Sequence, residues 1–217
     1  QGYHIVLKTN DTFDLYRVTS VRNAPGSCSN TQGQTGWGIW SINNKTLLQN
    51  YAMPANGIIF VEDHVWVSGQ INTARVTIAA GRFPDSATTR KDIIVNNDLL
   101  YTNYDGQDTI ALIAQGNITT GLYSDDSLRI DAALIAQNGR VGRYYYSGNN
   151  CSANASRSDI TLFGMIGTKL RYGFAYTDGT GYDIRNIIYD GNLLYAPPPS
   201  FPLTSSQYSI LSWEEIK

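Results

Sequence analysis

Three groups of carboxylates are the strongest candidates for acid–base chemistry in this 217-residue chain. They are Glu62 with Asp63, Asp125 with Asp126, and Asp131, which follows Arg129 by two positions. Two clustered carboxylates act as acid and base in glycoside hydrolysis. Neighbouring residues of a strand point to opposite faces, so adjacency does not make the first two a catalytic pair. We expect the second pair to form a solvated turn and Asp131 to form a surface ion pair.

Histidine and metal chemistry have less support. His4 and His64 are the only histidines, and no Gly-x-Ser-x-Gly or His-Glu-x-x-His motif accompanies them. We therefore expect no catalytic residue, no cofactor and no zinc site, with His64 in a structural role. Asp105 and Asp178 lie where oxygen-bearing residues alternate around glycines, but neither segment completes a twelve-residue calcium loop. We predict no metal, and calcium near either residue is the alternative.

The two cysteines, Cys28 and Cys151, lie in loops rich in Ser, Asn and Gly. Their spacing is not that of a metal site, which leaves a disulfide or two free thiols in a cytosolic protein. We favour the disulfide, because exposed thiols in polar loops are a liability outside the cell. It would close a loop of about 120 residues and stabilise the fold by roughly 4–5 kcal/mol.

Tyrosine is unusually frequent, with fifteen residues. Aromatic side chains at a surface bind sugars and protein partners. The candidates for such a surface contact are Tyr144, Tyr145, Tyr146 and Tyr182. The alternative is that tyrosines fill the margins of a β-rich core and keep their hydroxyl groups in water.

The composition is that of a globular domain, with 42% hydrophobic and 16% charged residues. A net charge of −2, a pI near 5.6 and the lack of a basic run argue against nucleic-acid binding. No apolar stretch is long enough to span a membrane, and no signal-peptide pattern opens the sequence, so we expect no membrane anchor in this chain. Because the sequence opens at Gln1 on a strand pattern, we expect a processed or truncated product.

Five short apolar stretches, each with Asn, Asp or Gly at its end, resemble one another. The clearest two share the sequence ALIAQ and begin at Ala111 and Ala133. Alignment of the five predicts neighbouring strands at 59–65, 76–81, 93–99, 112–118 and 133–141. Recurrence at about 20 residues is typical of stacked repeats, in which each unit buries its apolar side chains against the next. The sequence therefore predicts an all-β fold, a β-solenoid stack like a right-handed β-helix.

The flanking regions predict further β structure. Alternation over 3–22, broken at Asn10 and Asp11, predicts an N-terminal hairpin, and 37–51 predicts a short strand with one helical turn. Residues 160–167 and 170–176 predict two more strands. The Pro-rich run 196–202 predicts an extended tail that wraps the outside. We expect Phe201, Tyr208 and Trp213 of this tail to cap a hydrophobic edge.

We expect a single β-rich ectodomain over residues 1–217. It divides into N-terminal strands and a loop (1–56), stacked strands (57–176) and a capping tail (177–217).

The C-terminal stretch YDGNLLYAPPPSFPLTSSQYSILSWEE (189–215) resembles large minor-pilin-like proteins encoded with bacterial type IV pilus systems. Residues 57–71, 128–146 and 160–176 also resemble that family, so the likeness runs from about Gly36 to Lys217. None of these motifs carries a catalytic residue. The resemblance implies extracellular exposure, in agreement with the disulfide. Members of the family typically begin with a cleaved leader and a hydrophobic helix, which this sequence lacks, so we interpret it as the surface-displayed portion.

The expected function is that of a non-enzymatic structural or adhesive component of type IV pili at the cell surface. Its partners would be other pilus subunits or a host or cell-surface ligand, bound by loops 23–36, 82–92 and 147–159 on a rigid stack. The alternative is a β-helical carbohydrate-binding module or polysaccharide-active enzyme. Two carboxylates within about 10 Å beside exposed aromatics would favour the enzyme. A flat aromatic platform without carboxylates would favour sugar binding.

Overall fold

Within the described part of the chain, the regular structure is β apart from two short 3₁₀ helices, which confirms the all-β prediction. The structure is a computed structural model that describes residues 1–201. Among these residues, no helix has the length and apolar character needed to cross a membrane. The elements are β1 (Tyr3–Leu7), β2 (Thr12–Val21), β3 (Ile42–Ala52), β4 (Ile58–Val61), β5 (Val65–Gln70), β6 (Arg75–Ala80), β7 (Ile93–Ile94), β8 (Leu99–Leu100), β9 (Thr109–Ala114), β10 (Ile118–Thr120), β11 (Ser127–Ala136), β12 (Val141–Arg143), η1 (Ala153–Ala155), β13 (Ser156–Thr168), β14 (Gly181–Tyr189) and η2 (Gly191–Leu194).

One column of parallel strands runs through β4, β6, β9 and the end of β11. Ile59 pairs with Ile78, Ile78 with Leu112, and Leu112 with Leu134. The last three of these side chains are fully buried in the central core. The column therefore repeats one apolar position from strand to strand, so each strand covers the side chains of its neighbour.

A second column is formed by β5, β7, β10 and β12, again in parallel. Val65 pairs with Ile93, Ile93 with Ile118, and Ile118 with Val141. These four aliphatic residues are also in the central core. The first residues of the four strands are therefore paired in register. The residue that precedes each strand is brought close to its counterparts on the neighbouring strands.

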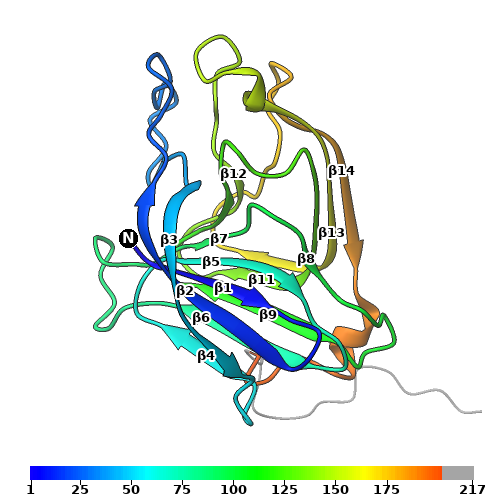
Figure 1. The fold of residues 1–217 in the computed structure, drawn as a ribbon. Helices are drawn as coiled ribbons and strands as arrows, with labels where there is room; N and C mark the ends of the chain where they lie inside the picture. The colour runs from blue at the N-terminus through cyan, green and yellow to red at the C-terminus, as the bar shows by residue number, and fades with distance from the viewer. Residues whose placement is uncertain (202–217) are drawn as a thin grey trace, which may run out of the picture.

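A third column runs through β8, the start of β11, β13 and β14. Leu99 pairs with Ile130, Ile130 with Leu162, and Leu162 with Ile187. Since β5 and β11 each contribute to two columns, all the strands belong to one curled sheet, whose β13 and β14 rise along one side in Figure 1.

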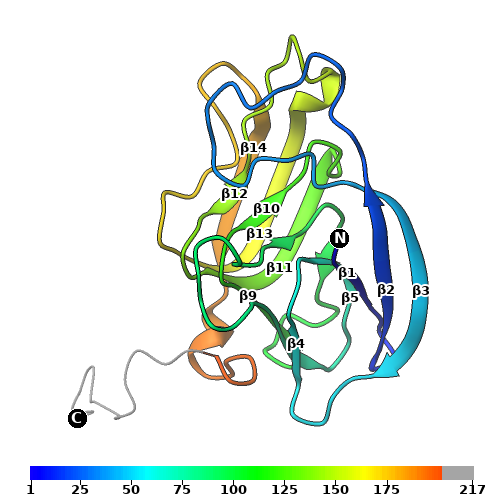
Figure 2. The same ribbon diagram turned by 90° about the vertical axis from the view of Figure 1, so that its left-hand side faces the viewer.

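The N-terminal hairpin is confirmed. β1 pairs antiparallel with β2, with Leu7 opposite Phe13, and parallel with β5 on its other side. β2 continues into an antiparallel pair with β3, which stands at the edge of the sheet in Figure 2. The helical turn predicted within 37–51 is wrong, because Ile42–Ala52 is a continuous strand. Pairing with the long β2 holds this polar segment extended although most of it is exposed.

The core lies inside the curled sheet and is almost entirely aliphatic. Its residues include Ile5, Val76, Ile110, Ile130 and Leu162, each of which is at most 1% exposed. Small residues occupy the same interior, as Ala114 and Ala136 do near the ends of their strands. Burial of such side chains stabilises a fold by about 1.5–3 kcal/mol each, before the entropy of ordering is counted.

The predicted register holds for the two ALIAQ segments but not for all five stretches. Ala111 pairs with Ala133, which confirms the longest match. Alignment of 93–99 with 112–118 and with 76–81 is wrong, because Ile93 pairs with Ile118 and lies in the second column. The neighbouring strands β4 and β6 are paired two residues away from the predicted register. Loop 82–92 lengthens the connection between β6 and β7, and this explains why 93–99 falls in a different column from 76–81.

The C-terminal part differs from the prediction at two places. Residues 170–176 form no strand and contribute two isolated bridges, from Gly173 to Gly142 and from Ala175 to Gly181. β14, within the predicted capping tail, is instead a long strand of the sheet paired with β13. Further along, the carbonyl oxygens of Pro197 and Pro199 accept hydrogen bonds from β6 side chains. Phe201 packs near Leu193, and the predicted caps Tyr208 and Trp213 lie outside the described residues.

Candidate functional site

Most of the predicted carboxylates are engaged by polar partners of their own. Asp63 accepts a hydrogen bond from Lys91 Nζ at 3.0 Å, and Glu62 beside it is exposed. Asp125 accepts from Asn97 Nδ2 at 3.0 and 3.1 Å. The neighbouring Asp126 accepts from Ser158 Oγ at 2.5 Å. The two carboxylates of each adjacent pair thus lie in different surroundings.

The predicted ion pair between Arg129 and Asp131 is confirmed, but Asp131 is buried and not at the surface as expected. Its carboxylate accepts hydrogen bonds from the Tyr101 backbone N–H at 3.1 Å and from the Tyr104 hydroxyl at 2.6 Å. Arg129 Nε donates to it at 2.9 Å. Three donors compensate the buried charge and anchor the loop after β8 to β11. A carboxylate held in this way is an internal structural anchor.

The histidine and calcium candidates have structural partners. His4 Nε2 lies 3.0 Å from Ser68 Oγ, and burial, followed by the nearby Lys45, lowers the pKa of His4 to about 3. Asp105 accepts hydrogen bonds from Gln107. Asp178 accepts from Thr180 N–H and from the Tyr145 hydroxyl. Within residues 1–201 no group of three or more His, Cys, Asp or Glu side chains is placed to hold a metal ion.

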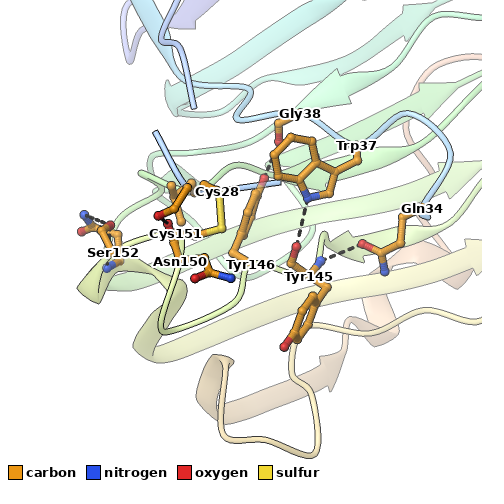
Figure 3. Close-up of a disulfide and its surroundings, with 12 residues drawn as sticks. Cys28, Gln34, Trp37, Gly38, Tyr145, Tyr146, Asn150, Cys151 and Ser152 are labelled. Carbon is orange, nitrogen blue, oxygen red and sulfur yellow. Dashed lines mark hydrogen bonds between the residues drawn. A yellow bond between two sulfur atoms is a disulfide. The ribbon is translucent and has the colours of Figure 1, made fainter. Parts of the chain in front are cut away.

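Cys28 and Cys151 form a disulfide, which confirms their predicted pairing. The bond joins two loops that stand at the same end of the molecule in Figures 1 and 2. Figure 3 shows the contacts around it: Trp37 Nε1 donates to the Tyr145 carbonyl at 2.9 Å, and Gln34 Oε1 accepts from the Tyr145 N–H at 2.7 Å. We call residues 23–40, 144–155 and 176–180 the loop cluster. Its three segments are tied by one covalent bond and several hydrogen bonds.

Three of the four candidate surface tyrosines are buried. Tyr144 and Tyr146 are about 1% exposed and Tyr182 is fully buried, so the prediction of an exposed surface at these positions is corrected. Tyr146 donates its hydroxyl to the Gly38 carbonyl at 2.6 Å, as Figure 3 shows. Only Tyr145 is partly exposed, and its hydroxyl donates to Asp178. The hydroxyl groups find polar partners inside the protein, which makes their burial possible.

A buried arginine explains where two of these rings lie. Arg143 is fully buried, and its guanidinium carbon is 5.0 Å from the Tyr146 ring centre and 5.5 Å from that of Tyr182. Its nitrogens donate to Ser124 Oγ and to backbone carbonyls, including those of Leu122 and Asn154. Carbonyl dipoles and ring faces together stabilise a charge that forms no salt bridge with the described residues. Arg143 thus joins the loop cluster to the sheet.

The column of β5, β7, β10 and β12 also aligns polar residues. Each strand is preceded directly by a polar side chain, and the strands are in register. The residues before the paired positions therefore stack at one corner of the sheet. We call this set the corner ladder: His64, Asp92, Asn117 and Arg140.

His64, Asp92 and Asn117 each accept a hydrogen bond from the backbone N–H of the next member of the corner ladder. The N–H of Asp92 donates to His64 Nδ1 at 3.1 Å, and that of Asn117 donates to Asp92 Oδ1 at 2.5 Å. The N–H of Arg140 donates to Asn117 Oδ1 at 3.0 Å. Gly116 has no room for a side chain, because a Cβ there would meet Asp92 Oδ1. The glycine in the Gly116–Asn117 corner is thus explained by close packing.

The corner ladder forms the floor of a pocket of about 540 Å³, which lies between the loop cluster and loop 82–92. We call it the corner pocket. Trp40 and Tyr144 line it as aromatic side chains, and Ala87 and Arg90 come from the loop. The Trp40 ring lies 5.2 Å from the His64 ring, centre to centre. The size is within the usual range of small-molecule pockets, about 300–1,000 Å³.

Burial shifts the pKa values of Asp92 and His64 in the corner pocket, and it also raises the pKa of Tyr144. It raises the pKa of Asp92 to about 6, although the backbone and side chain of Asn117 donate to the carboxylate. It also lowers the pKa of His64 to about 4, with a further contribution from Lys91. Because His64 Nδ1 accepts a backbone N–H, the proton of the neutral ring is on Nε2. The pocket therefore presents a neutral imidazole beside a carboxyl group of raised pKa.

The corner pocket contains none of the carboxylates selected from the sequence. Within residues 1–201, Asp92 is the one acidic residue that lines it. The signal in the sequence that could have revealed the pocket was a polar residue directly before each apolar strand. That signal identifies neighbours only when the strand register is known, and the predicted register placed 93–99 incorrectly. Loops 23–36 and 82–92, both predicted for display, do contribute to the pocket.

No family model, curated protein sequence or solved structure matches the chain.

Proposed function

We propose that this chain is a non-enzymatic, surface-displayed structural or adhesive component associated with type IV pili. The observation that carries the proposal is the loop cluster. Loops separated by 123 residues in sequence are fastened by a disulfide at one end of the sheet. Disulfides persist in oxidising compartments, as expected outside the cell. Loops held on a rigid scaffold are a common means of recognition.

The proposal includes the finer fold class, a short β-solenoid like a right-handed β-helix. Its support is the parallel pairing of three columns that share β5 and β11. Such a stack is extended, and both the edge strand β3 and the edge strand β14 carry exposed aliphatic residues, including Leu47 and Ile188. The C-terminal resemblance to minor-pilin-like proteins supplies the association with pili. Pilus subunits, or a ligand on another cell, are the proposed partners.

The second candidate function is carbohydrate binding, and the corner pocket favours it. A tryptophan, a carboxylate and an amide converge there in a concave site. Only one carboxylate among the described residues lines this pocket, whereas hydrolysis of a glycoside uses a pair. Between the two alternatives of a binding module and a polysaccharide-active enzyme, the pocket therefore supports the binding module.

Cell fractionation tests the proposal. The full-length protein, tagged and expressed in a bacterium with the pilus system, should be recovered with sheared pili and labelled on intact cells. A strain without pilus assembly is the control and should lose the sheared fraction. Recovery only inside the cell would contradict the proposal, as would turnover of a polysaccharide by the purified chain.

A further inference from the structure

The corner ladder does not use all of its hydrogen-bonding groups. Asp92 is 6% exposed, and only its Oδ1 is occupied, by the backbone and side chain of Asn117. Among the described residues, Asp92 Oδ2 has no hydrogen-bond partner, with His64 Nδ1 beyond bonding distance at 3.9 Å. His64 Nε2, which carries the ring proton, has no partner among them either. One acceptor and one donor thus remain available side by side on residues that line the pocket.

We propose that the corner pocket binds a neutral saccharide through two adjacent hydroxyl groups. One hydroxyl donates a hydrogen bond to Asp92 Oδ2, and its neighbour accepts a hydrogen bond from His64 Nε2. Trp40 packs against the C–H face of the sugar ring. This inference rests on the adhesive part of the proposed function and names the chemical class of its ligand.

Charge and shape favour a neutral ligand over an ion. Arg90 is bound in a two-pronged pair with Asp85, at 2.9 Å for both contacts, so its charge is largely compensated. Arg140 donates to the Arg143 carbonyl and to the Tyr176 hydroxyl, and its guanidinium lies over the Tyr144 ring. An anion would meet the Asp92 carboxylate, and a metal ion would find a single acidic ligand.

The aromatic wall adds the apolar half of the recognition. The Trp40 carbonyl accepts hydrogen bonds from Trp66 Nε1 at 2.9 Å and Asn96 Nδ2 at 2.6 Å. Trp40 Nε1 donates to the Gly36 carbonyl at 3.0 Å. These contacts fix both ends of the residue, so its ring is held in position before a ligand arrives. Pre-ordered side chains lose little conformational entropy on binding.

The test combines glycan binding with two conservative variants. Asp92→Asn keeps an oxygen for the Asn117 N–H and removes the charged acceptor. His64→Asn keeps an oxygen in place of Nδ1 and removes the Nε2 donor. Asp63→Asn is the matched control, because Asp63 directly precedes His64 in the chain but does not line the pocket. Far-UV circular dichroism and thermal unfolding verify that each variant folds.

Purified wild-type chain is first applied to an array of neutral oligosaccharides. One arm holds animal cell-surface glycans and the other bacterial polysaccharide fragments, so the source of the ligand is distinguished. Calorimetry with the methyl glycoside of the terminal sugar then compares the variants. We expect Asp92→Asn and His64→Asn to weaken binding at least ten-fold, and Asp63→Asn to change it less than two-fold.

Two results would overturn the inference: no binding on either arm, or wild-type affinity in the folded Asp92→Asn and His64→Asn variants. The pilus fractionation distinguishes this failure from failure of the proposed function. Loss of glycan binding with recovery on pili removes only the saccharide site. Glycan binding without recovery on pili removes only the pilus association.

Discussion

The substitution Asp92→Asn tests the electrostatics of the corner ladder through the pH dependence of stability. The pKa of Asp92 is raised from 3.8 to about 6 by burial. A raised carboxyl pKa means that the folded state holds its proton over a range in which the unfolded state has lost it. Wild-type stability from this group therefore falls as pH rises between about 4 and 6. A shift of that size corresponds to about 3 kcal/mol.

The variant has no titrating group at this position, so its stability does not decrease with rising pH as that of the wild type does. We expect the unfolding free energy of Asp92→Asn, relative to wild type, to increase by about 2.5 kcal/mol between pH 4 and pH 7.5, because part of the full shift lies below pH 4. Two other groups act in the opposite direction. The lowered pKa values of His64 and His4 make stability rise with pH below 6.5, but they are present in both proteins. The difference between the proteins isolates Asp92.

Urea unfolding followed by tryptophan fluorescence at half-unit pH intervals measures this difference by linear extrapolation. Asp63→Asn is the control. Burial on its own raises the pKa of Asp63, but hydrogen bonds from Lys91 and the His64 backbone outweigh it and lower the pKa. That group titrates below the tested range, so its difference from wild type should stay constant. A constant difference for Asp92→Asn as well would refute the reasoning.

Three further substitutions test the sheet and the loop cluster. Replacement of Cys28 and Cys151 by serine opens a loop with a separation of 123 residues; it should lower the unfolding free energy by about 5 kcal/mol in urea titrations. Leu134→Ala removes a fully buried side chain of the first column; the expected loss is about 2–5 kcal/mol by the same assay. Gly69→Ala places a Cβ against the Leu7 carbonyl at a φ of +108°, and it should lower the melting temperature, at a cost of about 1–3 kcal/mol.

Each of these predictions has a control on the same chain. Reduction of the wild-type protein should reproduce the cysteine variant, and unchanged stability on reduction would contradict the loop-closure argument. Leu194→Ala changes a side chain that is 69% exposed and should be neutral. Gly26 has open space around it, so Gly26→Ala should also be neutral. Equal effects at the buried and exposed positions would contradict the proposed packing.

Local patterns predicted the elements better than their partners. The hairpin at Asn10 and Asp11 follows from strand alternation and a turn, both of which are local. The ALIAQ pair was recognisable because the two segments share their sequence and occupy paired positions in one column. The column in which 93–99 lies depends on the length of loop 82–92. The pattern of apolar residues in the strands does not show how that loop shifts the pairing. Register across such an excursion is determined by packing against residues distant in sequence.

The tyrosine prediction failed for a related reason. The sequence does not distinguish Tyr146 and Tyr182 from exposed tyrosines, because a phenol ring with its hydroxyl group suits both the protein interior and the surface. Their burial depends on Arg143, whose charge needs ring faces and carbonyls from several segments. The corner pocket was missed because its members lie in four separate corners. Only the pairing of the strands shows that His64, Asp92 and Asn117 are neighbours.

The disulfide also determines how the protein responds to a pulling force. When tension is applied across the sheet from β1 to β14, the load passes through the sulfur–sulfur bond and bypasses the chain between the two cysteines. At about 3.4 Å per extended residue, a separation of 123 residues keeps roughly 420 Å of chain from lengthening while the bond is intact. The core strands β4 to β12 lie within that protected length. Until the sulfur–sulfur bond breaks, that length cannot add to the extension of the protein, even after the flanking strands have detached.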